Sequence, residues 1–131
     1  MSTFNAIGVA GTGVTVYRKW LDAVSDNIAN IDNVTRTSQP AFQARYVVAQ
    51  EAQDGNGAQV GGIAYGSAEG RLEYDPDNPM ADTEGYVRRP DIDLGGQMAQ
   101  MIMAQRAYQA NLAVVDRARD AYQSALQLGK G

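Results

Sequence analysis

The sequence predicts a mainly α protein, in which two long terminal helices form a coiled-coil-like antiparallel pair around a small β-rich or irregular insert. Two observations support this prediction. Apolar residues recur at alternating spacings of three and four near both ends, which is the pattern of a helix packed along one narrow line. The residues between lack this period and contain all four prolines. The expected boundaries are residues 1–33 for the first helix, 34–90 for the insert and 91–131 for the second helix, with both helices in one core domain.

The first helix is predicted from a stripe of regularly spaced apolar residues. Gly8, Gly11 and Gly13 weaken its first turns, each by about 1 kcal/mol relative to alanine. Asn30 and Asn33 mark its end, because their side chains compete for nearby backbone groups. The stripe consists of Ile7, Ala10, Val14, Tyr17, Leu21, Val24, Ile28 and Ile31.

The insert is predicted to contain short strands. A first strand is expected over residues 42–49, where Phe42, Ala44, Tyr46 and Val48 alternate with Gln43, Arg45, Val47 and Ala49. Asp54-Gly55-Asn56-Gly57 is a strong turn signal. Further extended stretches are expected near residues 60–65, 72–74 and 85–89. A sheet this small rarely folds alone, so we expect it to pack on the helices or on another subunit.

The second helix is predicted to begin after Pro90, with Asp91 or Asp93 as its N-terminal cap, and to run to about Leu128. Glycine and lysine at positions 129–131 suit its C-terminus. Gln105 and Arg119 interrupt its apolar stripe. These two polar residues either set the register of the helix pair or lie at a frayed, solvent-exposed part of the seam. The stripe consists of Leu94, Met98, Met101, Gln105, Tyr108, Leu112, Val115, Arg119, Tyr122 and Leu126.

The two stripes have two possible partners. They either close a helical hairpin within one chain or are shared between subunits, and a hairpin can still present Tyr17, Tyr108 and Tyr122 to neighbours. An unpaired stripe buries little apolar area, and the free energy gained from that burial does not offset the entropy cost of ordering a helix. We therefore expect one or both ends to be loosely ordered in a free monomer. Asn27, Asn30 and Asn111 are expected to set helix contacts, or else to lie at a helix end or on a solvated face.

Composition excludes several classes of function. The formal charge of −4 argues against a general nucleic-acid binder and against binding to anionic lipid. The chain has no cysteine, so it has no thiolate metal site and no cysteine nucleophile. It has no histidine either, which removes the commonest general base and metal ligand. No apolar run is long enough to span a membrane, and no cleavable secretory signal is expected, so export needs another route.

No catalytic, cofactor or metal site is expected. An acidic run over residues 75–93 lacks the glycine that an EF-hand loop needs at its sixth position, where this chain has Met80. Paired carboxylates hydrolyse glycans in some proteins, and Glu69, Glu73 and Glu84 are the candidates. Nothing implies the deep apolar cleft that raises a carboxylate pKa, so we expect no enzymatic activity.

Two segments resemble the signatures of one family. Residues 21–33, with Asn27-Ile-Ala-Asn30 near their end, resemble the N-terminal signature of the bacterial flagellar rod and hook proteins. Residues 106–115, with the core Tyr108-Gln109-Ala-Asn111, resemble its C-terminal signature. Residues 77–87, followed by Pro90, and residues 39–45 are most similar to the short proximal rod members of the flagellar basal-body rod family.

The resemblance implies a structural subunit of the proximal rod, exported by the flagellar type III apparatus without a cleaved signal and assembled in the periplasm. The implied partners are further copies of the chain and other rod proteins, with no nucleic acid, small-molecule substrate or membrane span. Copies would carry torque through helical assembly. The alternatives are a cytoplasmic coiled-coil adaptor and, far behind, a peptidoglycan hydrolase. Assembly and packing are assigned to Ile7, Val14, Tyr17, Leu21, Val24, Asn27, Ile28, Asn30, Ile31, Leu94, Met98, Met101, Tyr108, Gln109, Asn111, Leu112, Val115, Tyr122 and Leu126.

Overall fold

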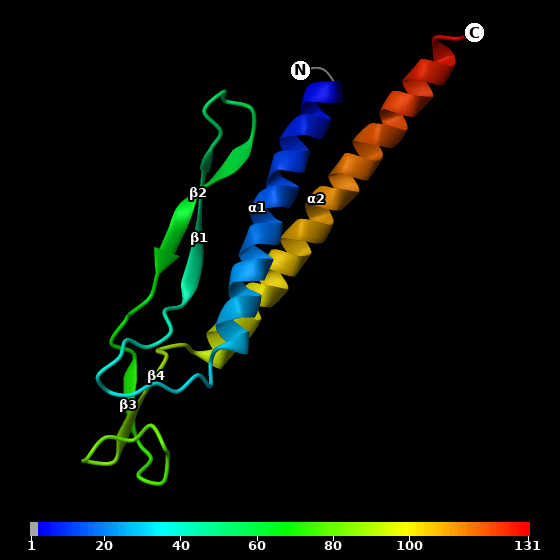
Figure 1. Ribbon diagram of the computed structural model, residues 1–131. Coiled ribbons are helices and arrows are strands. Elements are labelled where there is room, and N and C mark those ends of the chain that lie inside the picture. The colour runs from blue at the N-terminus through cyan, green and yellow to red at the C-terminus, as the bar shows by residue number, and fades with distance from the viewer. Residues whose placement is uncertain (1–2) are drawn as a thin grey trace. The chain divides into compact units, whose positions relative to one another are not determined.

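A computed structural model describes residues 3–131 as two helices with a small insert of antiparallel strands between them (Figure 1). This arrangement confirms the predicted mainly α class. The elements in chain order are α1 (Thr3–Ala29), β1 (Arg45–Glu51), β2 (Ala58–Tyr65), β3 (Arg71–Tyr74), β4 (Tyr86–Arg89) and α2 (Leu94–Leu128).

The chain divides into two compact units, and both helices contribute to each. The first unit consists of Met1–Leu21, Val47–Gly62 and Ile102–Gly131, and the second of Asp22–Tyr46 and Ile63–Met101. In the first unit, the rings of Phe4 and Tyr122 lie 4.6 Å apart, and Gly13 lies against Asn111. Residue numbers rise along α1 as they fall along α2, so the helices run antiparallel within this unit. The coiled-coil character of their packing stays a prediction.

The ends of both helices follow local side-chain chemistry. The amide group of Asn30 donates to the carbonyl oxygen of Asp26 at 2.8 Å, so α1 ends at Ala29, a few residues before the expected boundary. At the start of α2, the carboxylate of Asp93 accepts a hydrogen bond from the backbone N–H of Gly96 at 2.8 Å. Asp93, rather than Asp91, is therefore the cap.

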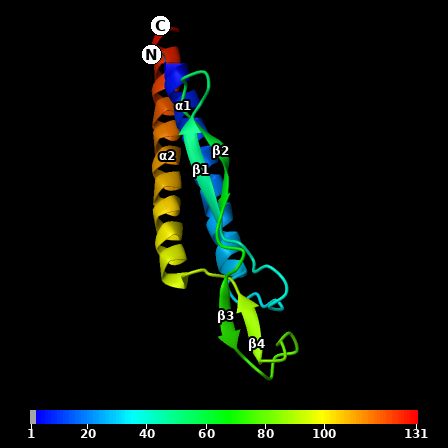
Figure 2. The same cartoon turned by 90° about the vertical axis from the view of Figure 1, so that its left-hand side faces the viewer.

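The strands form two separate two-stranded sheets, β1–β2 and β3–β4 (Figure 2). The β3–β4 ribbon is antiparallel and pairs Arg71 with Arg89 at one end and Tyr74 with Tyr86 at the other. Strands occur in all four stretches where the sequence predicts them. The chain adopts positive φ at Gly55 (71°) and Gly57 (110°) in the turn after β1, which explains the glycines of the turn signal.

The tip of the β1–β2 hairpin is attached to α1 within the first unit. The hydroxyl group of Thr12 donates to the carbonyl oxygen of Val9 and accepts a hydrogen bond from the backbone N–H of Ala58 at 3.1 Å. A Cβ atom added at Gly57 would lie 2.2 Å from the Thr12 hydroxyl oxygen, so only glycine permits this close approach.

The buried residues are mostly small. Ala10, Val16 and Ala104 are buried in the first unit, and the larger buried set of the second unit consists of Ala23, Val24, Ala41, Ala44, Val87, Pro90 and Ile92. Small side chains let backbones approach closely but bury little area each. Among residues 3–131, neither helix is apolar over a length that would cross a membrane.

Candidate assembly surfaces

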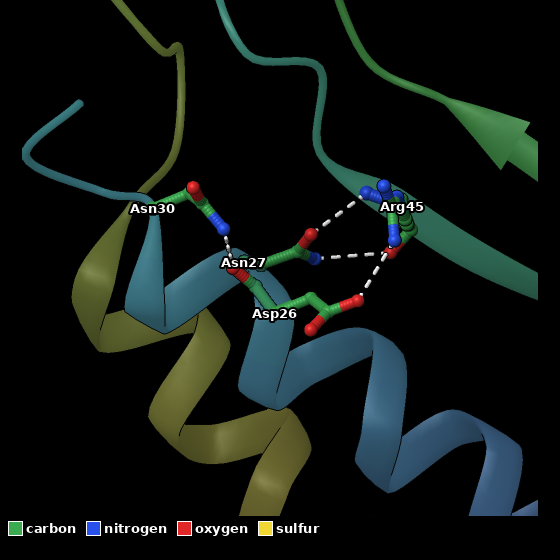
Figure 3. Close-up of polar contacts among 4 residues, drawn as sticks. All are labelled: Asp26, Asn27, Asn30 and Arg45. Carbon is green, nitrogen blue, oxygen red and sulfur yellow. Dashed lines mark hydrogen bonds and ion pairs between the residues drawn. The ribbon is translucent and has the colours of Figure 1, made fainter. Parts of the chain in front are cut away.

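The centre of the second unit is the side-chain amide of Asn27, which is fully buried (Figure 3). Its nitrogen donates to the carbonyl oxygen of Arg45 at 2.9 Å, and its oxygen accepts from the backbone N–H of Arg45 at 2.8 Å. Both backbone groups of the first residue of β1 are thus satisfied by one helix side chain, as a neighbouring strand would satisfy them.

The same amide nitrogen also donates to the side-chain oxygen of Gln97, on α2, at 3.0 Å. Gln97 is 4% exposed, so this bond lies in a water-poor environment. Both N–H groups of the Asn27 amide are then used. One side chain therefore connects α1 with the start of β1 and with α2 inside the second unit.

An ion pair lies beside this network. The guanidinium group of Arg45 and the carboxylate of Asp26 are 2.8 Å apart, with about half of each side chain exposed. Exposed pairs contribute about 0–1 kcal/mol, so this pair orients Arg45 more than it stabilises the fold. Asn30, by contrast, bonds only within its own helix end (Figure 3).

The first predicted stripe lies on the inner side of α1. Val24 is buried with the Asn27 amide, and the exposed face of the helix instead carries residues such as Arg18, Asp22 and Ser25. The remaining assigned residues of this part of the chain are half-buried, and they are Ile7, Val14, Tyr17, Leu21, Ile28, Asn30 and Ile31.

The members of the second predicted stripe differ in their exposure. Four of them, Met101, Tyr108, Val115 and Tyr122, are half-buried. The other six are exposed, and they are Leu94, Met98, Gln105, Leu112, Arg119 and Leu126. The assigned residue Gln109 is exposed as well, whereas Asn111 is half-buried. The assignment of the stripe to contacts within the chain or between subunits stays a prediction.

The inner side of α2 alternates larger residues with small or polar ones. Gln97 and Ala104 are buried, Asn111 and Ala118 are half-buried, and they lie at a constant spacing of seven. A search of the sequence for bulky apolar residues finds a neighbouring line of α2 instead of this inner one. The inner line is missed because a close contact between helices needs small side chains rather than large ones. The available signal was the seven-residue spacing of these four residues, with the half-buried Met101, Tyr108 and Val115 between them and Tyr122 after the last.

Tyr17 lines an open groove in the first unit. The groove has a volume of about 310 Å³, and its walls come from Gly13, Val16, Tyr17, Trp20, Val47, Ala49, Ala58 and Asn111. Its lining is mostly apolar, so it suits an apolar side chain better than a charged ligand.

The loop between β3 and β4 is organised by the carboxylate of Asp82. It accepts hydrogen bonds from the backbone N–H groups of Tyr86 and Glu84, both at 2.9 Å, and from the hydroxyl group of Thr37 at 3.0 Å. The bond from Tyr86 is the main cause that lowers the pKa of Asp82 below its usual value of 3.8, with Thr37, Glu84 and Gly85 adding to it against the opposing effect of burial.

Large apolar side chains remain exposed on two surfaces. On α2 these include Leu94, Met98, Ile102, Met103, Leu112 and Leu126, each 37–59% exposed. On the β3–β4 ribbon they are Leu72 (60%), Tyr74 (64%) and Tyr86 (38%). Exposed apolar area on this scale is typical of surfaces that contact other proteins. Within residues 3–131, no cluster of three or more acidic side chains is arranged to hold a metal ion.

Comparison with known proteins gives a consistent result. Residues 83–128 match the family model described as flagellar basal body rod FlgEFG protein C-terminal. Over its full length, the chain is similar to flagellar basal-body rod proteins FlgC. It is 36% identical to the protein of Yersinia enterocolitica and 33% identical to that of Salmonella typhimurium, with 99% of this chain and all of each relative covered. The protein of Borreliella burgdorferi is 32% identical, with both chains fully covered.

Proposed function

The chain belongs to the FlgC family of flagellar basal-body rod proteins and is a structural subunit of the rod, and from this premise we propose how it assembles and transmits torque. The single observation that carries the proposal is the row of apolar residues that α2 leaves exposed, which includes Leu94, Met98 and Leu112. These side chains are 37–54% exposed within the described residues 3–131, whereas a subunit inside a rod is surrounded by neighbours. We therefore assign them to contacts between subunits.

The remaining assembly residues act from inside the chain. The inward residues of both helices, such as Val24, Met101 and Tyr122, form a coiled-coil-like seam that keeps the helices paired. Asn27 sets the position of the insert on that pair, while Asn111 and Gln109 lie farther along α2. Residues 1–33 and 91–131 together form the core domain, and residues 34–90 contact neighbouring rod proteins.

Torque is carried mechanically by many copies of this unit. Heterologous contacts, in which one surface meets a different surface of the next copy, generate open helical assemblies rather than closed pairs. The partners are other copies of the chain and other rod proteins, reached in the periplasm after export by the flagellar type III apparatus without cleavage. The protein binds no nucleic acid or small-molecule substrate and needs no cofactor.

The free subunit is less ordered than the assembled one. Residues 119–131 are exposed apart from Tyr122, so this end of the chain has few buried contacts to hold it. Amide hydrogen exchange on a dilute monomer measures this directly. Fast exchange at one or both helix ends is expected, and strong protection throughout residues 4–33 and 94–128 would contradict it.

Electron microscopy of cell envelopes tests the proposed role. Cells that lack only this chain are expected to retain membrane rings without a rod, and the full-length chain should restore the rod. Intact rods and filaments in such cells would reject the role and favour a cytoplasmic adaptor. Glycan-release assays with the Glu84→Gln variant as control test the absence of hydrolase activity, and none is expected from either protein.

A further inference from the structure

The two compact units carry opposite charge. The first contains six basic and four acidic side chains, a formal charge of +2. The second contains five basic and eleven acidic side chains, a formal charge of −6, and together they give the net −4 of the chain. A contact between the second units of two copies would bring like charges together, whereas a contact between unlike units is favoured.

Much of the negative charge of the second unit lies in the loop of the β3–β4 ribbon and the strand residues next to it, whereas Arg71, Arg88 and Arg89 lie at the other end of the ribbon. Residues 72–87 include five carboxylates and no basic residue. Glu73 is ion-paired with Arg89 at 2.9 Å, and Asp75 and Asp82 accept hydrogen bonds within the loop. The side chains of the other two, Asp77 and Glu84, are exposed and have no partner within residues 3–131.

An apolar face accompanies these free carboxylates. Register places Leu72, Tyr74 and Tyr86 on one side of the ribbon together with Arg88, whose guanidinium group donates to the backbone carbonyl oxygens of Glu69 and Thr37. Val87, on the opposite side, is fully buried. The rings of Tyr74 and Tyr86 are 5.3 Å apart and form an edge-to-face pair. We call Leu72, Tyr74 and Tyr86, together with Asp77 and Glu84 of the loop that joins the two strands, the acidic ribbon. Aromatic residues with a polar rim are typical of the centre of a protein interface.

A complementary surface lies on α2 in the first unit. Arg106 and Arg117 are eleven residues apart, which is three helical turns or about 16 Å, so they share one side of the helix. Both are exposed, and neither has a hydrogen-bond or ion-pair partner among residues 3–131, although Asp120 lies one turn beyond Arg117. Met103, which is 59% exposed, lies on the same side with Ala110 and Ala113. We call the surface of Met103, Arg106, Ala110, Ala113 and Arg117 the basic stripe.

We propose that the acidic ribbon of one copy docks on the basic stripe of a second copy of this chain. The proposal rests on the structural role given above and adds which surfaces meet. Two free carboxylates face two free guanidinium groups, and the exposed leucine, tyrosine and methionine side chains supply the apolar area between them. Alanine at the middle of the stripe leaves room for the tyrosine rings. The contact joins different surfaces, so it repeats from copy to copy.

Charge reversal in cells tests the proposal. The Asp77→Lys/Glu84→Lys chain and the Arg106→Glu/Arg117→Glu chain should each lose on the order of tenfold or more of the rod-incorporated protein. A chain that carries all four changes restores complementarity and should recover incorporation. The matched control is Glu51→Lys/Asp54→Lys, which makes the same charge change at exposed positions of the β1–β2 hairpin and should assemble normally. Circular dichroism of each purified chain verifies that it folds.

Cross-linking provides a second readout with the natural charges in place. The chain has no cysteine, so Thr83→Cys and Ala113→Cys chains can be co-expressed and treated with a flexible bismaleimide in isolated rods. A dimer that requires both chains is expected, and the pair Thr83→Cys with Ser25→Cys, an exposed residue of α1, should give none.

The outcomes separate this inference from the structural role. Normal incorporation of the ribbon variant, failure of the fourfold variant to recover, or absence of the 83–113 cross-link would each overturn the docking. If the ribbon contacts a different rod protein instead, the ribbon variant should lose rod incorporation and the fourfold variant should fail to recover it. The structural role is judged independently, by whether rods form in cells that lack the chain.

Discussion

Asn27 on α1 and Gln97 on α2 are joined by a hydrogen bond of 3.0 Å between buried side-chain amides. The same Asn27 amide holds both backbone groups of Arg45. The bond is therefore part of a network that joins three elements. Removing it should lower the free energy of unfolding by more than the loss of a single surface hydrogen bond does, because buried polar groups are left without partners.

The Asn27→Ala variant is expected to lower the free energy of unfolding by about 2–4 kcal/mol, since it leaves two backbone groups and Gln97 unsatisfied. Urea unfolding followed by circular dichroism measures this. Asn30→Ala is the matched control and should cost less than about 1 kcal/mol, because Asn30 bonds only the carbonyl of Asp26 at an exposed helix end. Equal effects of the two substitutions would contradict the role given to Asn27.

Acid should loosen the β3–β4 loop through Asp82. The pKa of Asp82 in the folded chain lies below its usual value of 3.8. The ionised carboxylate therefore contributes fully to stability above that value, and this contribution is lost as the pH falls through the lower folded pKa. The protection of the Tyr86 and Glu84 amides, that is, how slowly they exchange relative to an unstructured peptide at the same pH, should fall in that range in the natural chain. In Asp82→Asn, exchange should already be faster at neutral pH and should lack this acid step, whereas Asp77→Asn should behave like the natural chain. A retained acid step in Asp82→Asn would count against this assignment.

The glycines of α1 should respond differently to alanine. Added Cβ atoms at Gly8 and Gly11 meet nothing within 4 Å, so each substitution should raise the free energy of unfolding by about 1 kcal/mol through helix propensity. A Cβ atom at Gly13 would lie 2.8 Å from the amide nitrogen of Asn111, which must move. Thermal unfolding should therefore show a smaller gain for Gly13→Ala. A gain equal to that of Gly8→Ala would indicate that Asn111 is not held against α1.

Leu112→Asp should block incorporation into the rod while export continues. Leu112 is 37% exposed, so an aspartate there keeps access to water in the free subunit and would lose it when buried against a neighbour. Circular dichroism of the purified variant checks that it folds. Immunoblots of exported and rod-bound protein, together with motility assays, measure the two steps. Leu112→Met preserves the apolar area and is the control. Normal motility of the aspartate variant would remove Leu112 from the assembly contacts.

Local chemistry was enough to predict most of the secondary structure. The asparagines after α1, the Asp93 cap, the glycine-rich turn after β1 and the alternation near residue 45 each act on neighbouring backbone groups, so their effects are visible in the sequence. The family was also recognisable from short segments, because its signatures lie within single helices.

The inner side of α2 was not predictable in the same way. The spacing of Leu94, Met98 and Leu112 predicts a packing seam but not whether it lies within the chain or between subunits, and the chain buries Gln97 and Ala104 on α2. Small residues on the inner side of α2 allow close approach of another backbone. The bulky residues of α2 then remain available for contacts with neighbouring subunits. The spacing of apolar residues in the sequence does not distinguish such contact residues from core residues.

The sequence by itself determined the two-helix architecture, the strands of the insert and the family, because these depend on periodicity, turn chemistry and contiguous motifs. Only the tertiary structure decided which line of α2 faces inward and that Asn27 binds both Arg45 and Gln97. It also decided that Asp77 and Glu84 find no partner in the part of the chain that the structure describes. These features depend on side chains brought together from distant parts of the chain, up to 70 residues apart for Asn27 and Gln97. Their distances and burial arise only when the backbone has closed around them.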